Sequence, residues 1–314
     1  MDGSQSRQVT GSTRIESVSE SPLPASFGVH AATFVSVVLP FLGFVVAVAL
    51  LWGWGLSWWH VGLFLGMFVL TGGGITVGFH RLFTHRSFET NKVIQFLLGV
   101  FGSMAVQGPL LRWVALHRCH HQHSDEQLDP HSPHRYGRGP FGVIRGMWHA
   151  HVGWVFAPDP PNLSHYIRDL RQSALLRTVS ALFPVWVAVG LVLPAVAGGL
   201  LWGTWSGAFL GFLWGGLVRV FFVHHVTWSV NSVCHLWGRQ PYPGADHSRN
   251  NLVFGILALG EGWHNNHHAF PTSARHGLRW WQPDLSYAVI RILAFLRLAW
   301  NVKVPTIQSQ TGRA

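Results

Sequence analysis

The chain has 314 residues, of which 48% are hydrophobic and only 11% are charged. A soluble domain carries about 25% charged residues, so this composition excludes an ordinary soluble fold and indicates a membrane protein. The 17 tryptophans and 21 histidines indicate lipid interfaces and metal chemistry. The net charge of +10 is not gathered into runs of Lys and Arg. It therefore argues against nucleic acid as a partner and favours anionic lipid headgroups or an acidic electron carrier.

The first 24 residues are polar and rich in serine, which predicts a disordered tail. They lack the charged start and short apolar stretch of a signal peptide. Residues 25–306 are predicted to form one domain, and 307–314 a second tail. The two cysteines, Cys119 and Cys234, imply no disulfide framework and no Cys-type zinc site, and they favour a reducing cytosolic setting.

Two long stretches, 21–80 and 178–218, contain no Asp, Glu, Lys or Arg. Each is long enough for two helices of about 20 residues, the length that crosses a bilayer, with a short turn between them. We therefore predict an all-α membrane protein with four transmembrane helices in two hairpins. The expected spans are about 31–52, 60–80, 178–199 and 204–226.

The two predicted turns, near 52–60 and 198–207, contain tryptophan but neither Lys nor Arg. Because basic residues accumulate on the cytoplasmic side of a membrane, both termini are predicted to be cytoplasmic. Residues 81–177 and 227–306 would then form a cytosolic helical cap over an integral, multi-pass membrane stem.

Residues 93–111 are apolar enough to resemble a fifth span. A crossing there would place the histidine motifs on either side of it on opposite membrane faces. We therefore expect an interfacial pair of helices that does not cross, and a similar interfacial segment at 287–298.

Histidines with regular spacing occur in four places. The groups are His80 with His85, His117 with His120 and His121, Asn231 with His235, and His264 with His267 and His268. Residues three and four apart share one helix face, which aligns every group except the first, whose spacing of five fits a helix end or a short unwound turn. Nine histidines and one asparagine are too many ligands for one metal ion and about right for two. Imidazole suits iron and zinc alike, so these residues do not name the metal.

Other histidines are expected to have different roles. Isolated ones, such as His276, are expected to be packed or exposed. Those near the groups but outside their spacing, among them His131 and His151, are expected to support the ligands, to be structural or to be exposed.

The sequence around these groups resembles the membrane fatty acyl desaturases, specifically their Δ9, stearoyl-CoA desaturase-like branch. The matching segments are GITVGFHRLFTHRSF (74–88), HRCHHQHSDEQLDPHSP (117–133), HVGW (151–154), NSVCHLWG (231–238), SRNN (248–251) and GEGWHNNHHAFP (260–271). The resemblance implies a four-helix stem under a cytosolic cap and a non-haem centre with two iron ions. It also implies that the nine histidines are the metal ligands and that Asn231 reaches one metal through water.

The same resemblance implies the reaction. With O2 and two electrons, two hydrogens are removed from neighbouring methylenes of a saturated acyl chain, giving a cis double bond and water. A bent apolar tunnel would hold the chain, and the distance from the headgroup would set the position of the bond. Phe68, Gly72, Trp113 and Trp154 are expected to line this tunnel, with Gly72 controlling chain length at its closed end.

Two departures from the acyl-CoA members concern the acyl carrier. Ala115 and Leu116 stand where those members have a charged Arg-Asp pair, and residues 155–159 lack the basic residues that usually follow HVGW. These charges contact the coenzyme A headgroup in the animal enzymes. The resemblance favours an acyl-CoA substrate, with a glycerolipid-bound acyl chain as the alternative.

The residues after His268 are too few for a further domain, so the electrons are expected to come from a separate ferredoxin or small haem protein with its reductase. An acidic carrier would suit the basic cytosolic face.

Two rival functions are compatible with a histidine-rich membrane protein. An alkane or lipid hydroxylase of the same metal class would insert oxygen and yield an alcohol. A histidine-rich metal transporter would need polar residues at mid-membrane, which both uncharged stretches lack. The wording of NSVCHLWG and GEGWHNNHH favours desaturation.

Overall fold

The computed structural model describes residues 27–51 and 55–313, and the fold is mostly helical. Within these residues, four helices are long and apolar enough to cross a membrane. They are Phe27–Leu50, Trp58–Thr84, Phe183–Trp202 and Trp205–His235. The first and third are the single helices α1 and α7. The second joins α2 (Trp58–Gly73) to the π-helix η1 (Gly74–Thr84). The fourth joins α8 (Trp205–Gly211), the π-helix η5 (Phe212–Val218), α9 (Arg219–Ser232) and the short η6 (Val233–His235).

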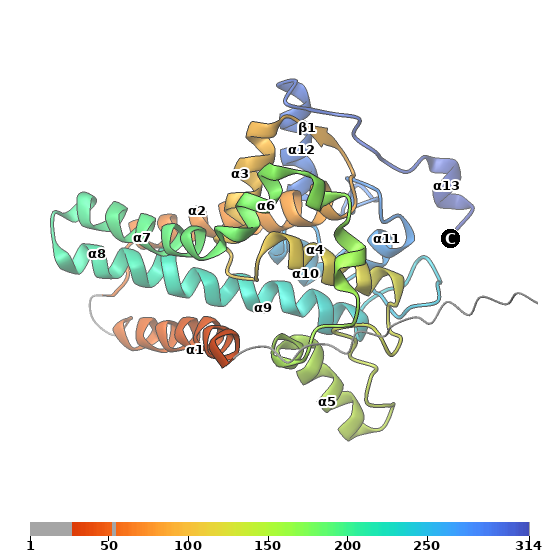
Figure 1. Ribbon diagram of the computed structural model, residues 1–314, viewed down its shortest axis with the longest axis horizontal. Helices are drawn as coiled ribbons and strands as arrows, with labels where there is room; N and C mark the ends of the chain where they lie inside the picture. Colours follow the sequence, from red (N-terminus) through yellow and green to blue (C-terminus); the bar gives the residue numbers. More distant parts are fainter. Residues whose placement is uncertain (1–26, 52–54, 314) are drawn as a thin grey trace, which may run out of the picture.

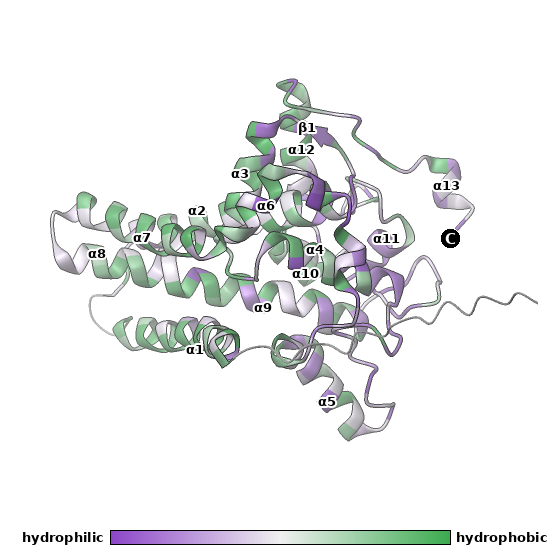
Figure 2. Cartoon of the chain, viewed as in Figure 1, coloured by the Kyte–Doolittle hydropathy of each residue, from purple (hydrophilic) through white to green (hydrophobic). Residues whose placement is uncertain are grey.

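These helices run along the long axis of the molecule, and the remaining elements gather at one end of them (Figure 1). Apolar residues dominate α1, α7 and α8, whereas polar residues gather at the opposite end, around α11 (His264–Ala269) (Figure 2). The start of α1 and the end of the described chain both lie on this polar side (Figure 1).

Two boundaries differ clearly from the predicted spans: the fourth helix continues to His235, beyond the predicted end at 226, and the third begins later than predicted. Residues 174–181 form a separate helix, α6 (Ala174–Ala181), and α7 begins only at Phe183. Leu182 leaves the helical region (φ −83°, ψ 15°), and Pro184 lies in the first turn of α7. Proline suits the first turn of a helix but removes a hydrogen bond in its interior, so the break falls there.

The fourth helix is the centre of the membrane bundle. Its η5 segment packs against α7, α1 and α2, and α8 packs along α7. The first predicted pair is arranged differently, because α1 makes its main helix contacts with η5 and α9 and not with its chain neighbour α2.

The polar end is built from short elements. They are α3 (Lys92–Ser103), α4 (Leu110–Gln122), α5 (Pro140–His151), η2 (Gly153–Phe156), η3 (Leu163–Ile167), η4 (Leu170–Gln172), α6, α10 (Leu252–Leu257), α11, α12 (Leu285–Phe295) and α13 (Ile307–Thr311). A two-stranded antiparallel sheet pairs β1 (Glu89–Thr90) with β2 (Ala299–Trp300), with Glu89 opposite Trp300.

Residues 93–111 form no fifth span. The 12 residues of α3 measure about 18 Å, which is shorter than the hydrocarbon core of a bilayer. A turn at 104–109, with Val106 at φ 61° and Gly108 at φ 98°, separates α3 from α4.

Close backbone packing joins α3 to η1. A Cβ on Gly74 would lie 2.2 Å from the backbone nitrogen of Gly102, so only glycine allows the two helices to approach here. Beside this crossing, the fully buried Arg219 donates to the carbonyl oxygens of Gly215, Met104 and Gly190 at 3.1, 2.6 and 2.8 Å. These contacts fix the membrane helices against the turn after α3.

Candidate metal centre

The nine predicted histidines meet where the membrane helices enter the polar end. His80 and His85 lie on and just after η1, His117, His120 and His121 on α4, His235 on η6, and His264, His267 and His268 on α11. They form two groups, and within each group the candidate ligand atoms all lie within 4.8 Å of one another. The first group is His80, His85, His117, His121 and His267, and the second is His120, His235, His264 and His268.

The spacing of five between His80 and His85 is explained by the π-helix. The backbone N–H of His85 donates to the carbonyl of His80 at 3.1 Å, an i→i+5 bond. This wider turn puts both rings on one face, with centroids 4.8 Å apart. Such π-helical turns are rare and occur frequently at functional sites.

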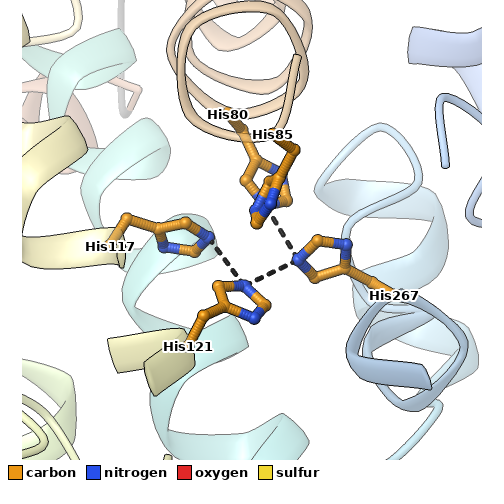
Figure 3. Close-up of side chains that lie close together, drawn as sticks. All are labelled: His80, His85, His117, His121 and His267. Carbon is orange, nitrogen blue, oxygen red and sulfur yellow. Dashed lines mark hydrogen bonds between the residues drawn. The ribbon is translucent and has the colours of Figure 1, made fainter. Parts of the chain in front are cut away.

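In the first group the rings converge on one point between η1, α4 and α11 (Figure 3). The Nε2 atom of His267 lies 3.0 Å from that of His80 and 2.9 Å from that of His121, and His121 Nε2 lies 3.1 Å from His117 Nε2. The Nε2 atom of His85 is buried and has no hydrogen-bond partner within the described chain.

In the second group the Nε2 atoms form a series from His235 through His264 and His268 to His120. His264 Nε2 lies 3.0 Å from His235 Nε2 and 3.1 Å from His268 Nε2, and His268 Nε2 lies 3.4 Å from His120 Nε2. His120 and His121 are neighbours on α4 but belong to different groups, and the same is true of His267 and His268 on α11. These two helices therefore hold the two groups next to each other.

Four carboxylates hold the rings from behind. Three of them accept a hydrogen bond of 2.9 Å from the Nδ1 atom of one histidine: Asp129 from His120, Asp125 from His235 and Asp246 from His268. The fourth, Glu261, lies with its Oε2 2.6 Å from His80 Nδ1. A proton on Nδ1 leaves the Nε2 lone pair free, and carboxylate–imidazole pairs of this kind typically orient metal ligands.

Burial alone would raise the pKa of Asp129, but His120 and the backbone N–H of His131 lower it below its ordinary value. Asp129 is therefore ionised at neutral pH and can accept these bonds. Burial, together with neighbouring histidines, lowers the pKa of His264, His267 and His268 well below the usual value. These rings are neutral at pH 7, the form that binds metal.

This donor set fits metal ions. Neutral imidazoles whose Nε2 lone pairs face one another at 2.9–3.4 Å repel unless a cation lies between them. Imidazole nitrogen is an ordinary ligand of iron, and the two groups supply five and four such atoms.

A cavity opens onto the metal centre. His80, His117, His264 and Asn231 line it at one end. All four predicted tunnel residues also line it: Phe68, Gly72, Trp113 and Trp154. Apolar side chains of α9 and α10, among them Val223 and Leu257, complete the wall towards the membrane helices.

Comparison with known proteins agrees with this arrangement. The family model for fatty acid desaturases matches residues 56–293.

The chain belongs to the fatty acid desaturase family.

It is 44% identical, over 271 residues, to a hex-5-enoyl-[acyl-carrier protein] acetylenase of Moorena producens, and the match covers 86% of this chain and 84% of the relative. It is 40% identical over 252 residues to an sn-1 stearoyl-lipid 9-desaturase of Anabaena variabilis, covering 79% and 85%. The corresponding protein of a Synechocystis species is 38% identical over 262 residues, covering 82% and 76%.

The family membership confirms the resemblance seen in the sequence. The protein is an acyl desaturase, an oxidoreductase of a family that uses iron. Its apolar helices and its relatives indicate membrane association.

Several residues around the centre were missed by the sequence analysis. The four carboxylates are among only 12 acidic residues in the chain. Three of the four, Asp125, Asp129 and Glu261, lie within the histidine segments quoted above, and this position could have identified them. His276, expected to be an ordinary packed or exposed residue, is fully buried with its ring centroid 5.4 Å from that of His80. Its Nδ1 lies 3.3 Å from Glu261, whose other oxygen faces the buried Arg81 at 3.4 Å.

His131 lies where a supporting role was expected, with its ring centroid 4.4 Å from that of His120. His151 lies apart from the centre, with its ring nitrogens 3.0 Å from the Ser232 hydroxyl and 2.9 Å from His225. Cys119 and Cys234 are buried free thiols.

Proposed function

We propose that this desaturase introduces a cis double bond at the Δ9 position of a saturated acyl chain with two iron ions. The observation that carries the proposal is the opening of two histidine groups onto one cavity lined by apolar side chains. The balanced reaction converts –CH2–CH2–, O2, two electrons and two protons into –CH=CH– and two water molecules. The Δ9 position is supported by the two stearoyl-lipid 9-desaturases among the relatives.

Each histidine group would hold one ion. His80, His85, His117, His121 and His267 would bind the first, and His120, His235, His264 and His268 the second, with Asn231 reaching the second through water. Iron bound there supplies the oxidising power with O2. The chain's own contribution is to hold the imidazoles by their Nδ1 atoms and to place the acyl chain beside them.

The cavity wall would position the reacting methylenes. Trp113 donates from Nε1 to the side-chain oxygen of Gln107 at 3.3 Å, and Gln107 donates to the Thr227 hydroxyl at 2.9 Å. These bonds satisfy polar groups that line an otherwise apolar passage. A wall of this kind would hold the acyl chain in place and exclude water from the reacting carbon atoms.

The polar end is proposed to be cytosolic, with four transmembrane helices below it. The distribution of Lys and Arg supports this orientation, and α1 begins on the same side (Figure 1).

Electrons are proposed to arrive from a separate acidic ferredoxin or small haem protein. A hollow on the outer side of α11 is lined by Arg239, Arg279, Trp263 and Asn266. Neither arginine side chain forms an ion pair with any residue that the structure describes. Trp263 directly precedes His264, so a carrier docked at this arginine hollow would lie close to the metal centre.

The printed names of relatives include acyl-carrier-protein, lipid and CoA substrates. The surface where the acyl chain enters the cavity therefore decides which of these acyl carriers the enzyme accepts.

Expression in a host that lacks unsaturated fatty acids tests the proposed reaction. We expect monounsaturated chains with the double bond at carbon 9, located by mass spectrometry of derivatised lipids. A variant with His264→Ala serves as the control and should give none. An alcohol product, or no change in the fatty acids, would contradict desaturation, and a bond elsewhere would contradict Δ9.

A further inference from the structure

The substrate cavity has an outer part with its own chemistry. Leu116 and Trp154 line both the cavity at the metal centre and a second hollow, here called the mouth. The mouth is formed mainly by residues 127–130 and 157–161, together with Arg135. An acyl chain that reaches the metal centre through the mouth leaves its carrier in contact with this surface.

The mouth offers little positive charge. Arg135 is the single basic residue among its described lining residues, and Asp129 and Asp159 line it as well. Arg112, beside the mouth, is already engaged, because its Nε and Nη2 donate to the two carboxylate oxygens of Asp159 at 3.0 and 2.6 Å. Phosphate groups are recognised by free Arg and Lys side chains. The mouth therefore offers the several phosphates of coenzyme A a single guanidinium, that of Arg135, next to the carboxylates of Asp129 and Asp159.

The mouth also lies close to a membrane helix. Trp154 belongs to η2, which contacts α1, one of the four apolar helices of membrane-crossing length. α5 leads into η2 along the chain, and α1 begins at the end of the helical bundle nearer to the cap (Figure 1). The mouth is thus at the level of the bilayer surface in the proposed orientation, and not at the far cytosolic end of the cap.

The helix that leads to η2 has an apolar face without a protein partner in the described structure. Phe141, Ile144 and Trp148 follow helical spacing on α5 and are 89%, 67% and 68% exposed. α5 contacts α9 and η2 and projects from the body (Figure 1). Exposure of this face to water is unfavourable, whereas burial in the boundary between headgroups and acyl chains is favourable. Arg138 and Arg145 lie on the same helix or next to it, as in helices that bind lipid surfaces.

We infer that the acyl carrier of this desaturase is a membrane glycerolipid. α5 lies in the bilayer surface beside the mouth, and the acyl chain of a lipid in the same leaflet enters there, while the uncharged ester region rests against the mouth. This inference rests on the proposed function, since it names the substrate class of the same site.

Purified, iron-loaded enzyme with a ferredoxin and its reductase provides the first test. One arm uses nanodiscs of distearoyl-phosphatidylglycerol. The other uses nanodiscs of diphytanoyl lipid, to which stearoyl-CoA or stearoyl acyl-carrier protein is added. We expect the double bond in the glycerolipid, formed at least about tenfold faster than in either thioester. Equal or faster conversion of a thioester would overturn the inference and leave the proposed reaction intact.

A second readout does not depend on turnover. A phosphatidylglycerol with a diazirine on its sn-1 chain is photolysed in nanodiscs that contain the enzyme. We expect cross-links to cavity residues such as Val223 and Leu257, and these should persist in excess stearoyl-CoA. Cross-links confined to outer helix faces, or abolished by stearoyl-CoA, would overturn the inference. Absence of any unsaturated product in the first test would count against the proposed reaction alone.

The contribution of α5 is tested with a double variant, Phe141→Ser with Trp148→Ser. Loss of its apolar face should lower glycerolipid desaturation by about tenfold. Ile307→Ser, on α13 and 82% exposed, is the matched control and should have no effect. Unchanged glycerolipid desaturation in the double variant would refute a role of α5 in the bilayer surface.

Discussion

His120 and His268 direct their Nε2 atoms at each other across 3.4 Å, while Asp129 and Asp246 hold the opposite nitrogen of each ring. With the protons fixed on Nδ1, both facing nitrogens carry lone pairs. Two lone pairs at this distance repel, so the arrangement is favourable only around a cation. Nε2 atoms face one another at 2.9–3.1 Å elsewhere in both groups, and this convergence is the physical basis for a metal centre in this protein.

The carboxylates behind the rings should control metal retention. Asp125→Asn replaces the carboxylate that pairs with His235 Nδ1 by an uncharged amide, and we expect the affinity for the second metal to fall by about 10–100-fold. Metal content after dialysis against a weak chelator measures this. Glu126→Gln is the matched control, because the neighbouring Glu126 is exposed and contacts only the non-ligand His123. Equal metal loss in both variants would show that Asp125 does not hold the site.

Chain length should depend on Gly72. A Cβ there would lie 3.2 Å from Leu259 Cδ1, inside the cavity wall, so Gly72→Leu shortens the space available to the acyl chain. We expect the products of this variant to shift towards shorter chains, as measured by gas chromatography of total fatty acids. Gly73→Leu is the control, since a Cβ at Gly73 meets no atom within 4 Å. An unchanged product profile in Gly72→Leu would remove Gly72 from chain-length control.

The arginine hollow should govern the electron donor. Charge reversal of Arg239 and Arg279 to Glu should raise the KM for an acidic ferredoxin and reduce the salt dependence of turnover, because long-range attraction is lost. Turnover driven by a small chemical reductant should be unaffected. Arg171 is exposed and lines none of the three cavities, so Arg171→Glu serves as the control. The same KM as in the unmodified enzyme would place the docking surface elsewhere.

Arg118 should stabilise the cap without binding metal. It lies within the second histidine segment, yet its guanidinium donates to the carbonyls of Phe83, Thr84 and Tyr166 and to both oxygens of Asp169. Arg118→Lys cannot make all of these bonds and should cost about 1–2 kcal/mol, read as a lower apparent Tm. Arg171→Lys should leave Tm unchanged.

The effect of Arg118→Lys should also depend on pH. Burial alone would raise the pKa of Asp169, but Arg118 and then Arg86 lower it below its ordinary value of 3.8. A carboxyl whose pKa is depressed in the folded state contributes stability above its unfolded pKa, and this contribution is lost as the pH falls through the folded pKa. The difference in Tm between the two proteins should therefore be constant near neutral pH and shrink below about pH 4. A difference that grows in acid would contradict the ion pair.

The histidine ligand candidates were accessible from the sequence because spacings of three and four define one face of a helix. Their division into two groups was not, because it depends on how α4 and α11 pack together. The carboxylate contacts are also tertiary, since Asp125 reaches His235 across 110 positions. The π-helix that aligns His80 with His85 occurs where η1 meets α3 through Gly74 and Gly102, a packing that local sequence does not specify.

The membrane helices could be predicted from the sequence because they lack charged residues. The helices against which each of them packs could not be predicted. Hydropathy identifies α1 but carries no information that it packs on η5 and α9 rather than on α2. The start of α7 depended on Pro184, whose position in a first turn was overlooked when the span was placed by composition alone.

Anomalous X-ray scattering at the iron absorption edge, from crystals of the iron-loaded enzyme, tests whether the nine histidines hold two iron ions. We expect two peaks, one enclosed by His80, His85, His117, His121 and His267 and the other by His120, His235, His264 and His268. A single peak, or iron bound away from these rings in protein that is active, would contradict this expectation.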